Sequence, residues 1–203
     1  MQKINYHNKM LEIIKQNKQK KKLLLQVCCA PCSSQVLNEL KDYFDIDIYF
    51  YNPNIYPEEE YYKRSEVVKK LVLQMNINCK VIVAKNNPNE FYSFVDTRSK
   101  DTEGGKSCYK CYELRLRQTA KFAKEHGYDF FTTSLSISPH KNSRWINEIG
   151  EKLEKEYEIR FLYSDFKKKD GYKKSIELSN KYNLYRQDYC GCVFSYKERE
   201  KIK

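Results

Sequence analysis

The chain has 203 residues, of which 38 are basic and 27 acidic, so its formal net charge is +11. Hydrophobic residues make up 40% and charged residues 32%, with 6 Gly and 5 Pro, a composition that excludes collagen-like and Pro/Gly-rich disordered chains. Its longest apolar runs, such as residues 23–25 and 81–84, fall far short of the roughly 20 residues of a membrane span. We therefore expect one folded globular domain that does not enter a membrane.

Residues 1–22 form a basic segment with one acidic residue and seven lysines: Lys3, Lys9, Lys15, Lys18, Lys20, Lys21 and Lys22. The segment lacks an apolar central stretch, so it is not a secretory signal, and we expect a cytoplasmic protein. We interpret it as a basic N-terminal arm that stays off the core and binds phosphates near the active site. The alternative is a solvated lysine-rich helix.

The remaining chain, residues 23–203, alternates between apolar strand-like runs and helical patterns. We expect a buried strand at residues 23–27, followed by a helix over 35–43 that Ser33 or Ser34 caps. The later strands are expected at 46–51, 79–84, 128–133 and 159–163. The later helices are expected at 58–76, 90–95, from 109 to near Gly127, from Asn142 or Ser143 to about 153, and at 172–182.

Residues 97–107 are polar and contain two glycines, so we expect a mobile loop there. Strands separated by helices require crossover connections, which favours a parallel sheet covered on both faces. The predicted fold is therefore a single α/β domain with a mostly parallel, Rossmann-like sheet. Ligands of such sheets bind at the carboxyl edge of the strands, where we expect a metal site.

Seven of the eight cysteines fall into three clusters, which are C-C-x-x-C at Cys28, Cys29 and Cys32, C-x-x-C at Cys108 and Cys111, and C-G-C at Cys190 and Cys192. Thiols in the cytosol stay reduced, so the clusters indicate metal binding rather than a disulfide framework. The stray Cys79 we interpret as a small buried hydrophobic residue.

The number of clustered thiols narrows the choice of metal. A tetrahedral zinc or a 4Fe-4S cluster uses four thiolates, and three remain to help hold a second metal. The clusters are dispersed over most of the chain, unlike the short span of a zinc ribbon. Two alternatives stay open: a zinc-stabilised RNA-binding module without catalysis, and a thiol-disulfide oxidoreductase that uses Cys108 and Cys111.

Five segments resemble the cobalamin-independent epoxyqueuosine reductase family, QueH. They are VCCAPCS (27–33), FYNPNIYPEEEYYKR (50–64), SCYKCYELRLRQTA (107–120), TTSLSISPHKN (132–142) and YCGCVFS (189–195). The resemblance covers nearly all of residues 23–195, in order, and leaves out the basic arm. It implies reduction of epoxyqueuosine to queuosine in the anticodon loop of a tRNA, with a 4Fe-4S cluster, an adjacent mononuclear iron and an external electron donor.

The resemblance also implies metal ligands. All seven clustered cysteines correspond to the metal-binding cysteines of the family. Our partition gives the 4Fe-4S cluster Cys29, Cys108, Cys111 and Cys192. It gives the single iron, and with it the catalytic role, to Cys28, Cys32 and Cys190.

Other polar residues fall near the predicted edge. Tyr51, Asn52 and Asn54 follow the second strand and can line a nucleoside pocket, or they only shape a turn around Pro53. Arg64 and Arg115 suit phosphate or base recognition, or lie on solvated helix faces. His140 and Lys141, at a helix start, can hold a phosphate. Tyr51 and His140 are the candidate proton donors.

Overall fold

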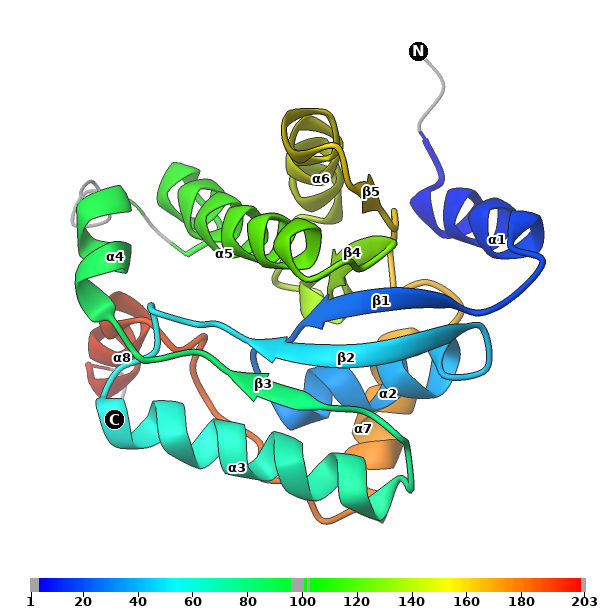
Figure 1. Ribbon diagram of the computed structural model, residues 1–203. Coiled ribbons are helices and arrows are strands. Elements are labelled where there is room, and N and C mark those ends of the chain that lie inside the picture. The colour runs from blue at the N-terminus through cyan, green and yellow to red at the C-terminus, as the bar shows by residue number, and fades with distance from the viewer. Residues whose placement is uncertain (1–3, 96–100, 102, 202–203) are drawn as a thin grey trace.

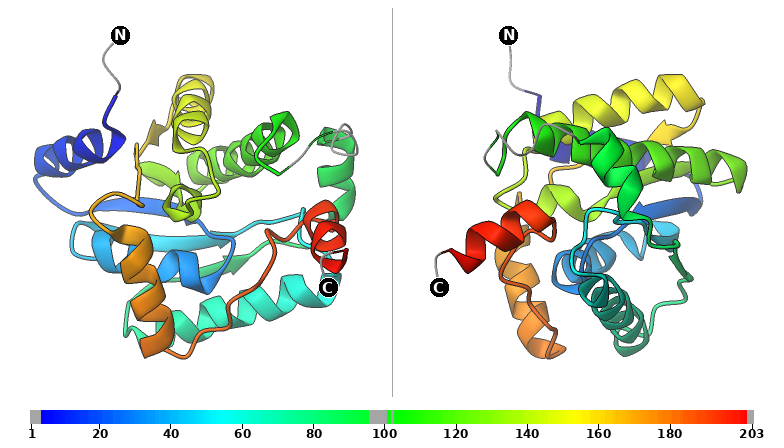
Figure 2. Two further views of the ribbon diagram at one scale, coloured as in Figure 1. Left: turned by 180° about the vertical axis from the view of Figure 1, so that it is seen from behind. Right: turned by 90° about the vertical axis from the view of Figure 1, so that its left-hand side faces the viewer.

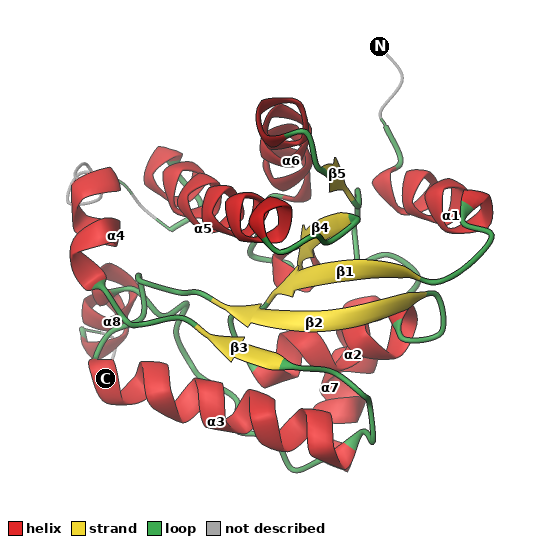
Figure 3. Ribbon diagram, viewed as in Figure 1, coloured by secondary structure: helices red, strands yellow, loops and turns green. Residues whose placement is uncertain are grey.

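Five parallel strands form one sheet in the order β3-β2-β1-β4-β5 (Figures 1 and 3). The computed structural model describes residues 4–95, 101 and 103–201. The strands are β1 Lys21–Gln26, β2 Phe44–Phe50, β3 Val81–Val83, β4 Phe130–Thr133 and β5 Arg160–Phe161. The predicted α/β class and the Rossmann-like parallel sheet are confirmed.

Helices cover both faces of this sheet (Figure 1). The helices are α1 Tyr6–Gln16, α2 Ala30–Leu40, α3 Glu58–Gln74, α4 Pro88–Phe94, α5 Lys106–Glu125, the short 3-10 helix η2 Ser134–Ile137, α6 Ser143–Tyr157, α7 Gly171–Lys181 and α8 Val193–Glu200. Helices α2 and α3 lie on one face, with α7 packed on α2, and helices α5 and α6 lie on the other.

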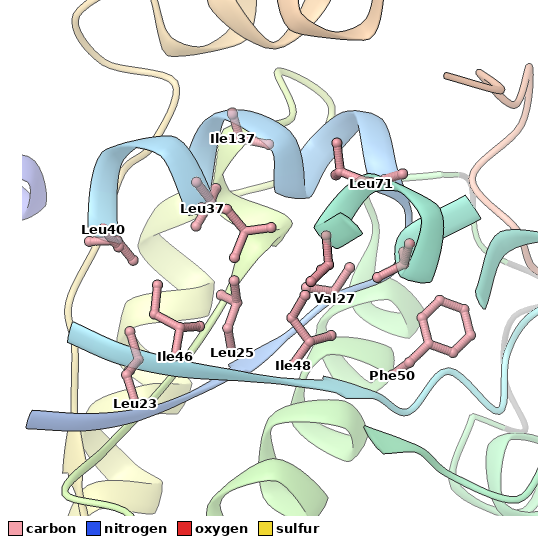
Figure 4. Close-up of a cluster of buried hydrophobic side chains, with 14 of the residues drawn as sticks. Leu23, Leu25, Val27, Leu37, Leu40, Ile46, Ile48, Phe50, Leu71 and Ile137 are labelled. Carbon is pink, nitrogen blue, oxygen red and sulfur yellow. The ribbon is translucent and has the colours of Figure 1, made fainter. Parts of the chain in front are cut away.

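The side chains of β1 alternate between the two faces and build a core on each. Leu23 and Leu25 point toward α2 and α3, as Figure 4 shows, whereas Leu24 packs among residues of α5 and α6. All three leucines are fully buried, and burial of each stabilises the fold by about 1.5–3 kcal/mol. A central strand that is apolar on both faces thus fixes the sheet beneath the cysteine edge.

Part of the predicted basic arm is folded onto the core. Residues Tyr6–Gln16 form α1, and Met10 in this helix is fully buried within the hydrophobic cluster of α2 and α3. The expectation that the composition keeps this segment off the core is therefore wrong for α1, because the apolar side of the helix is buried. Helix α1 also lies where β1 begins, at the opposite edge from Cys28 (Figure 1). The division of the chain into an N-terminal arm, residues 1–22, and a catalytic domain, residues 23–203, stays a prediction.

Three local expectations differ from the structure. Strand β3 begins at Val81, so Cys79 precedes it and is half-buried against the core. Helix α8 was not predicted at all, since its charged sequence gives little periodic signal. Of the mobile loop expected at 97–107, residues 97–100 and 102 lie outside the described residues, and Lys106 already belongs to α5.

Candidate metal centre and substrate cavity

The first cysteine cluster lies where β1 passes into α2. Cys29 is the N-cap residue and Cys32 lies in the first helical turn, and the Sγ atoms of these two and of Cys28 lie within 4.8 Å of one another. The predicted serine caps are wrong. Pro31 favours a helix start at this point, so Ser33 instead donates back to the main-chain oxygens of Cys29 and Ala30. The early start places Cys28, Cys29 and Cys32 together around the N-terminus of α2.

Buried amides tie the carboxyl ends of three strands together beside these thiols. Gln26 in β1 donates to the Asn52 side chain at 3.0 Å and accepts from Thr133 in β4 at 2.7 Å. Asn52 in turn donates to the main-chain oxygen of Val27 at 2.8 Å and is fully buried. Asn52 therefore supports the strand ends and does not line a nucleoside pocket, which corrects that interpretation.

The second cluster occupies the first turns of α5. Cys108 and Cys111 are both buried, and the main-chain N–H of Gly104 lies 3.3 Å from the Cys108 sulfur. The helix N-terminus favours negative charge, which opposes the effect of burial on a thiolate at this place. This confirms the predicted placement of the C-x-x-C pair at a helix start.

The C-G-C turn brings the third cluster to the same edge. Gly191 has a φ of +128°, and a Cβ atom there would come within 3.0 Å of Arg64 Nη1, so glycine is required. Cys192 is the N-cap of α8, and its sulfur accepts from the main-chain N–H of Ser195 at 3.5 Å. In the right-hand view of Figure 2, the carboxyl edge of the strands faces the viewer, and α8 (red) lies at the front.

Two cavities meet at this edge, and Cys190 lines both. A cavity of about 390 Å³ is lined by Cys28, Pro31, Cys32, Glu103, Leu135, Ser138, His140, Lys141, Tyr172, Arg186, Gln187, Asp188, Tyr189 and Cys190. A smaller one is lined by Asn54, Phe91, Val95, Ser107, Cys108, Cys111, Tyr112, Arg115, Lys141, Cys190 and Cys192. The fold thus brings together at one edge all seven clustered cysteines and leaves Cys79 apart.

Three buried cations surround the thiols. Arg64 donates to the Cys190 main-chain oxygen at 3.3 Å, and Arg115 donates to that of Cys111 at 3.2 Å. Lys141 donates from Nζ to the Cys190 sulfur at 2.8 Å. The solvated-face alternative for both arginines is therefore wrong, and the Lys141 ammonium points inward to the Cys190 sulfur. Buried cations at this position offset the charge of thiolates.

The thiols and cations shift each other's protonation. The hydrogen bond to Cys29 raises the pKa of Cys28 to about 12, and hydrogen bonds from Cys28 and Cys32 hold the pKa of Cys29 well below its usual range. Burial raises the pKa of Cys111 to about 12. Burial lowers the pKa of Lys141, but the neighbouring Cys190 outweighs it, and the net pKa is raised well above the usual value. The site therefore favours few free thiolates, and a bound metal would displace thiol protons.

The residues present fit an inorganic group with several thiolate ligands. The donor set consists of sulfur, which suits zinc or iron–sulfur clusters. Two buried donors beside the thiols, Arg64 Nη2 and the Tyr112 hydroxyl, have no hydrogen-bond partner within the described part of the chain. Negatively charged groups bound beside these donors would satisfy them.

The other candidate residues from the sequence differ in whether they line a cavity. Asn54 lines the smaller cavity with a buried, unpartnered Oδ1 among the described residues, and His140 lines the larger cavity. Tyr51 donates to the Glu90 carboxylate and does not line the larger cavity, so it is poorly placed as a proton donor there. Sequence reasoning missed the contact of Lys141 with sulfur and the cavity residues Glu103 and 186–188. The sequence had singled out Lys141 only as a residue of the 132–142 segment and as a possible phosphate ligand at a helix start.

The chain is similar to known proteins over most of its length. A family model described as "Epoxyqueuosine reductase QueH" matches residues 23–198. The chain is 44% identical over 203 residues to the epoxyqueuosine reductase QueH of Staphylococcus epidermidis, covering 96% of this chain and 85% of that protein. It is 36% identical over 178 residues to the QueH of Thermotoga maritima, covering 87% and 91%.

Solved structures show the same fold at low sequence identity. The U34-tRNA thiolase NcsA from Methanococcus maripaludis, with its 4Fe-4S cluster, matches with a TM-score of 0.55 and 12% identity, over 96% of this chain and 71% of that one. A predicted subunit of tRNA methyltransferase from Methanocaldococcus jannaschii matches with a TM-score of 0.52 and 15% identity, over 78% and 76%.

Proposed function

The chain belongs to the epoxyqueuosine reductase QueH family, and we propose that it reduces epoxyqueuosine to queuosine in tRNA with a 4Fe-4S cluster and an adjacent iron. The observation that carries the proposal is the meeting of all seven clustered cysteines at one sheet edge of a chain that is 34–44% identical to QueH proteins. The enzyme class is accordingly an oxidoreductase that acts on tRNA.

The reaction explains why an inorganic group is needed. Removal of the epoxide oxygen leaves an alkene and releases water, which consumes two electrons and two protons, and amino-acid side chains do not supply such electrons. Held by the clustered cysteines, an iron–sulfur group would supply such electrons one at a time from an external reductant, and an adjacent iron would act as a Lewis acid toward the epoxide oxygen. The external electron donor stays a prediction.

Burial supports our division of the cysteines. The four proposed cluster ligands are buried, and they are Cys29, Cys108, Cys111 and Cys192. The three proposed iron ligands are half-buried, line the larger cavity, and are Cys28, Cys32 and Cys190. A metal that meets substrate has to be reachable from outside, whereas an electron-transfer cluster does not.

The larger cavity is the proposed substrate site. Its volume of about 390 Å³ lies in the range of small-ligand pockets. Tyr172 lines this cavity and offers an aromatic ring for stacking of an unpaired base, and a base in a single-stranded anticodon loop can be splayed out without melting a duplex. His140, which lines this cavity, is the better placed of our two candidate proton donors.

Two further observations bear on the proposal. A 4Fe-4S cluster accompanies this fold in NcsA, which supports the fold as a scaffold for such a cluster. No helix in the described part of the chain is long and apolar enough to cross a membrane. A cytoplasmic location stays a prediction.

The decisive experiment is anaerobic purification with iron, zinc and acid-labile sulfide counted per chain, followed by incubation with dithionite and epoxyqueuosine-containing tRNA. We expect iron with sulfide, and conversion of the tRNA nucleoside to queuosine. Zinc alone without conversion would favour an RNA-binding module. A metal-free protein with a redox-active Cys108–Cys111 pair would favour dithiol chemistry.

A further inference from the structure

Lys141 has an unusual environment for a lysine. It lies between η2 and α6, where its main-chain N–H donates to the Ser138 oxygen at 3.2 Å. Its side chain is 9% exposed, with Nζ 2.8 Å from the Cys190 sulfur and 3.5 Å from Glu103 Oε1. The loop thus directs an ammonium group inward onto a proposed metal ligand.

The other two buried cations at the site bind differently. Arg64 and Arg115 hydrogen-bond main-chain oxygens of cysteine residues, at Cys190 and Cys111. Lys141 instead donates to a sulfur atom, and Lys141 and Cys190 both line both cavities. The positive charge of Lys141 therefore acts on any metal that the Cys190 sulfur binds.

We propose that Lys141 is a positioning residue that fixes the Cys190 sulfur and makes the metal centre ligated by this sulfur easier to reduce, while Glu103 moderates its effect. The inference rests on the proposed function, since it assumes an iron centre at Cys190. Hydrogen bonds and positive charge at a ligating sulfur stabilise the more negative, reduced state. A carboxylate near the ammonium opposes this stabilisation.

Removal of the Lys141 charge and removal of the Glu103 charge should shift the midpoint potential of the metal centre in opposite directions. Lys141→Met keeps the apolar stem but removes the cation, so the midpoint potential should become more negative. At a fixed potential, the ratio of reduced to oxidised centre should fall about tenfold, which is about 59 mV for a one-electron couple. Glu103→Gln removes the opposing charge, so the potential should become more positive. A merely structural contact would not reverse sign between the two variants.

The experiment is an anaerobic redox titration followed by electron paramagnetic resonance, with iron and sulfide counted in each variant. Lys155→Met and Glu151→Gln are the matched controls, because this exposed pair at 3.3 Å on α6 has the same charges and similar separation. Neither control should move the potential, since exposed charges are screened.

Opposite shifts in Lys141→Met and Glu103→Gln support the inference, and unchanged potentials or shifts of the same sign overturn it. If Lys141→Met fails to retain iron, Glu103→Gln decides: a positive shift supports the inference, and no shift or a negative one overturns it. A wild-type protein without iron and sulfide would refute the proposed function itself, and the inference with it.

Discussion

Arg64 Nη1 donates to the main-chain oxygen of Cys190 at 3.3 Å, across 126 residues of sequence, and so joins α3 to the C-G-C turn. The same guanidinium pairs with Glu60 through Nε at 2.7 Å, and Glu60 accepts from the Tyr185 hydroxyl at 3.1 Å. The position of a proposed metal ligand therefore depends on an ion pair buried in α3.

Arg64→Met should destabilise the protein by about 3–5 kcal/mol, because it leaves Glu60 buried without its cation. The matched control is Arg144→Met. Arg144 pairs with Glu148 at the same 2.7 Å and the same helical spacing, but its side chain is 78% exposed against 1% for Arg64. The control should cost at most about 1 kcal/mol. Urea unfolding of both variants measures the difference, and equal costs would contradict the importance of burial.

Cys111→Ala should remove the proposed 4Fe-4S cluster, because alanine offers no thiolate. The purified variant should lose acid-labile sulfide and its brown colour. Cys79→Ala is the control, since Cys79 precedes β3 and packs on the core away from the other seven cysteines. It should keep iron, sulfide and activity. Loss of the cluster in Cys79→Ala would show that our interpretation of this residue is wrong.

Cys32→Ala should remove about one iron per chain and abolish turnover while most sulfide remains, as expected for a separate Lewis-acid metal. Cys32→Asp should retain this iron, because a carboxylate also ligates it. Metal and sulfide analysis of both variants tests the partition. Loss of the whole cluster in Cys32→Ala would assign this thiol to the cluster instead.

Met10→Ala should cost about 2–5 kcal/mol, because Met10 is fully buried where α1 meets the core. The neighbouring Leu11 is 39% exposed, so Leu11→Ala should change the free energy of unfolding by no more than about 0.5 kcal/mol. Iron and sulfide should be unchanged in folded Met10→Ala, since α1 lies at the opposite edge. Equal stability of the two variants would mean that α1 does not dock in solution.

Acidification should weaken the fold through His7. Burial lowers the pKa of His7, and the nearby Lys169 lowers it further, so the folded pKa lies below the unfolded value of 6.5. The stability contributed by neutral His7 is therefore fully present above the unfolded pKa and is lost as the pH falls through the folded pKa. His7 Nδ1 lies 3.8 Å from Glu39, whose own pKa is raised, first by burial.

We expect the free energy of unfolding to fall between about pH 7.5 and about pH 5 in the wild type, and to fall less in His7→Asn. Exposed His126 provides the control, since His126→Asn should keep the wild-type pH profile. Urea unfolding across this range measures the effect. Identical pH profiles of His7→Asn and the wild type would contradict it.

Much of the fold could be predicted because its signals are local. The runs 23–25 and 128–133 and the helices between strands indicated a parallel sheet, and crossover geometry then required the strand ends to share an edge. That rule alone places Cys28 on the same edge as the other strand-end loops. Asn142 as a helix cap was likewise confirmed, since its side chain accepts from Trp145 N–H at 3.2 Å.

The local sequence pattern gave the wrong expectation at two places, the start of α2 and the N-terminal segment, where it favoured one structure and the packing favoured another. Ser33 and Ser34 both favour a helix cap, but Pro31 permits an earlier start, and the packing of α2 on β1 decides between them. The lysines of the N-terminal segment indicated a solvated arm, although one face of α1 carries Met10 and Ile13 toward the core.

By itself, the sequence determined the fold class, the family and the seven cysteines proposed as metal ligands, because strand periodicity and cysteine spacing are properties of neighbouring residues. The tertiary structure alone decided which charges are buried. Arg64 and Arg115 have the same local pattern as solvated helix residues, and Lys141 that of an exposed loop. Their burial depends on partners from distant segments, such as Cys190 for both Arg64 and Lys141, because a charge leaves water only where the fold supplies a compensating group.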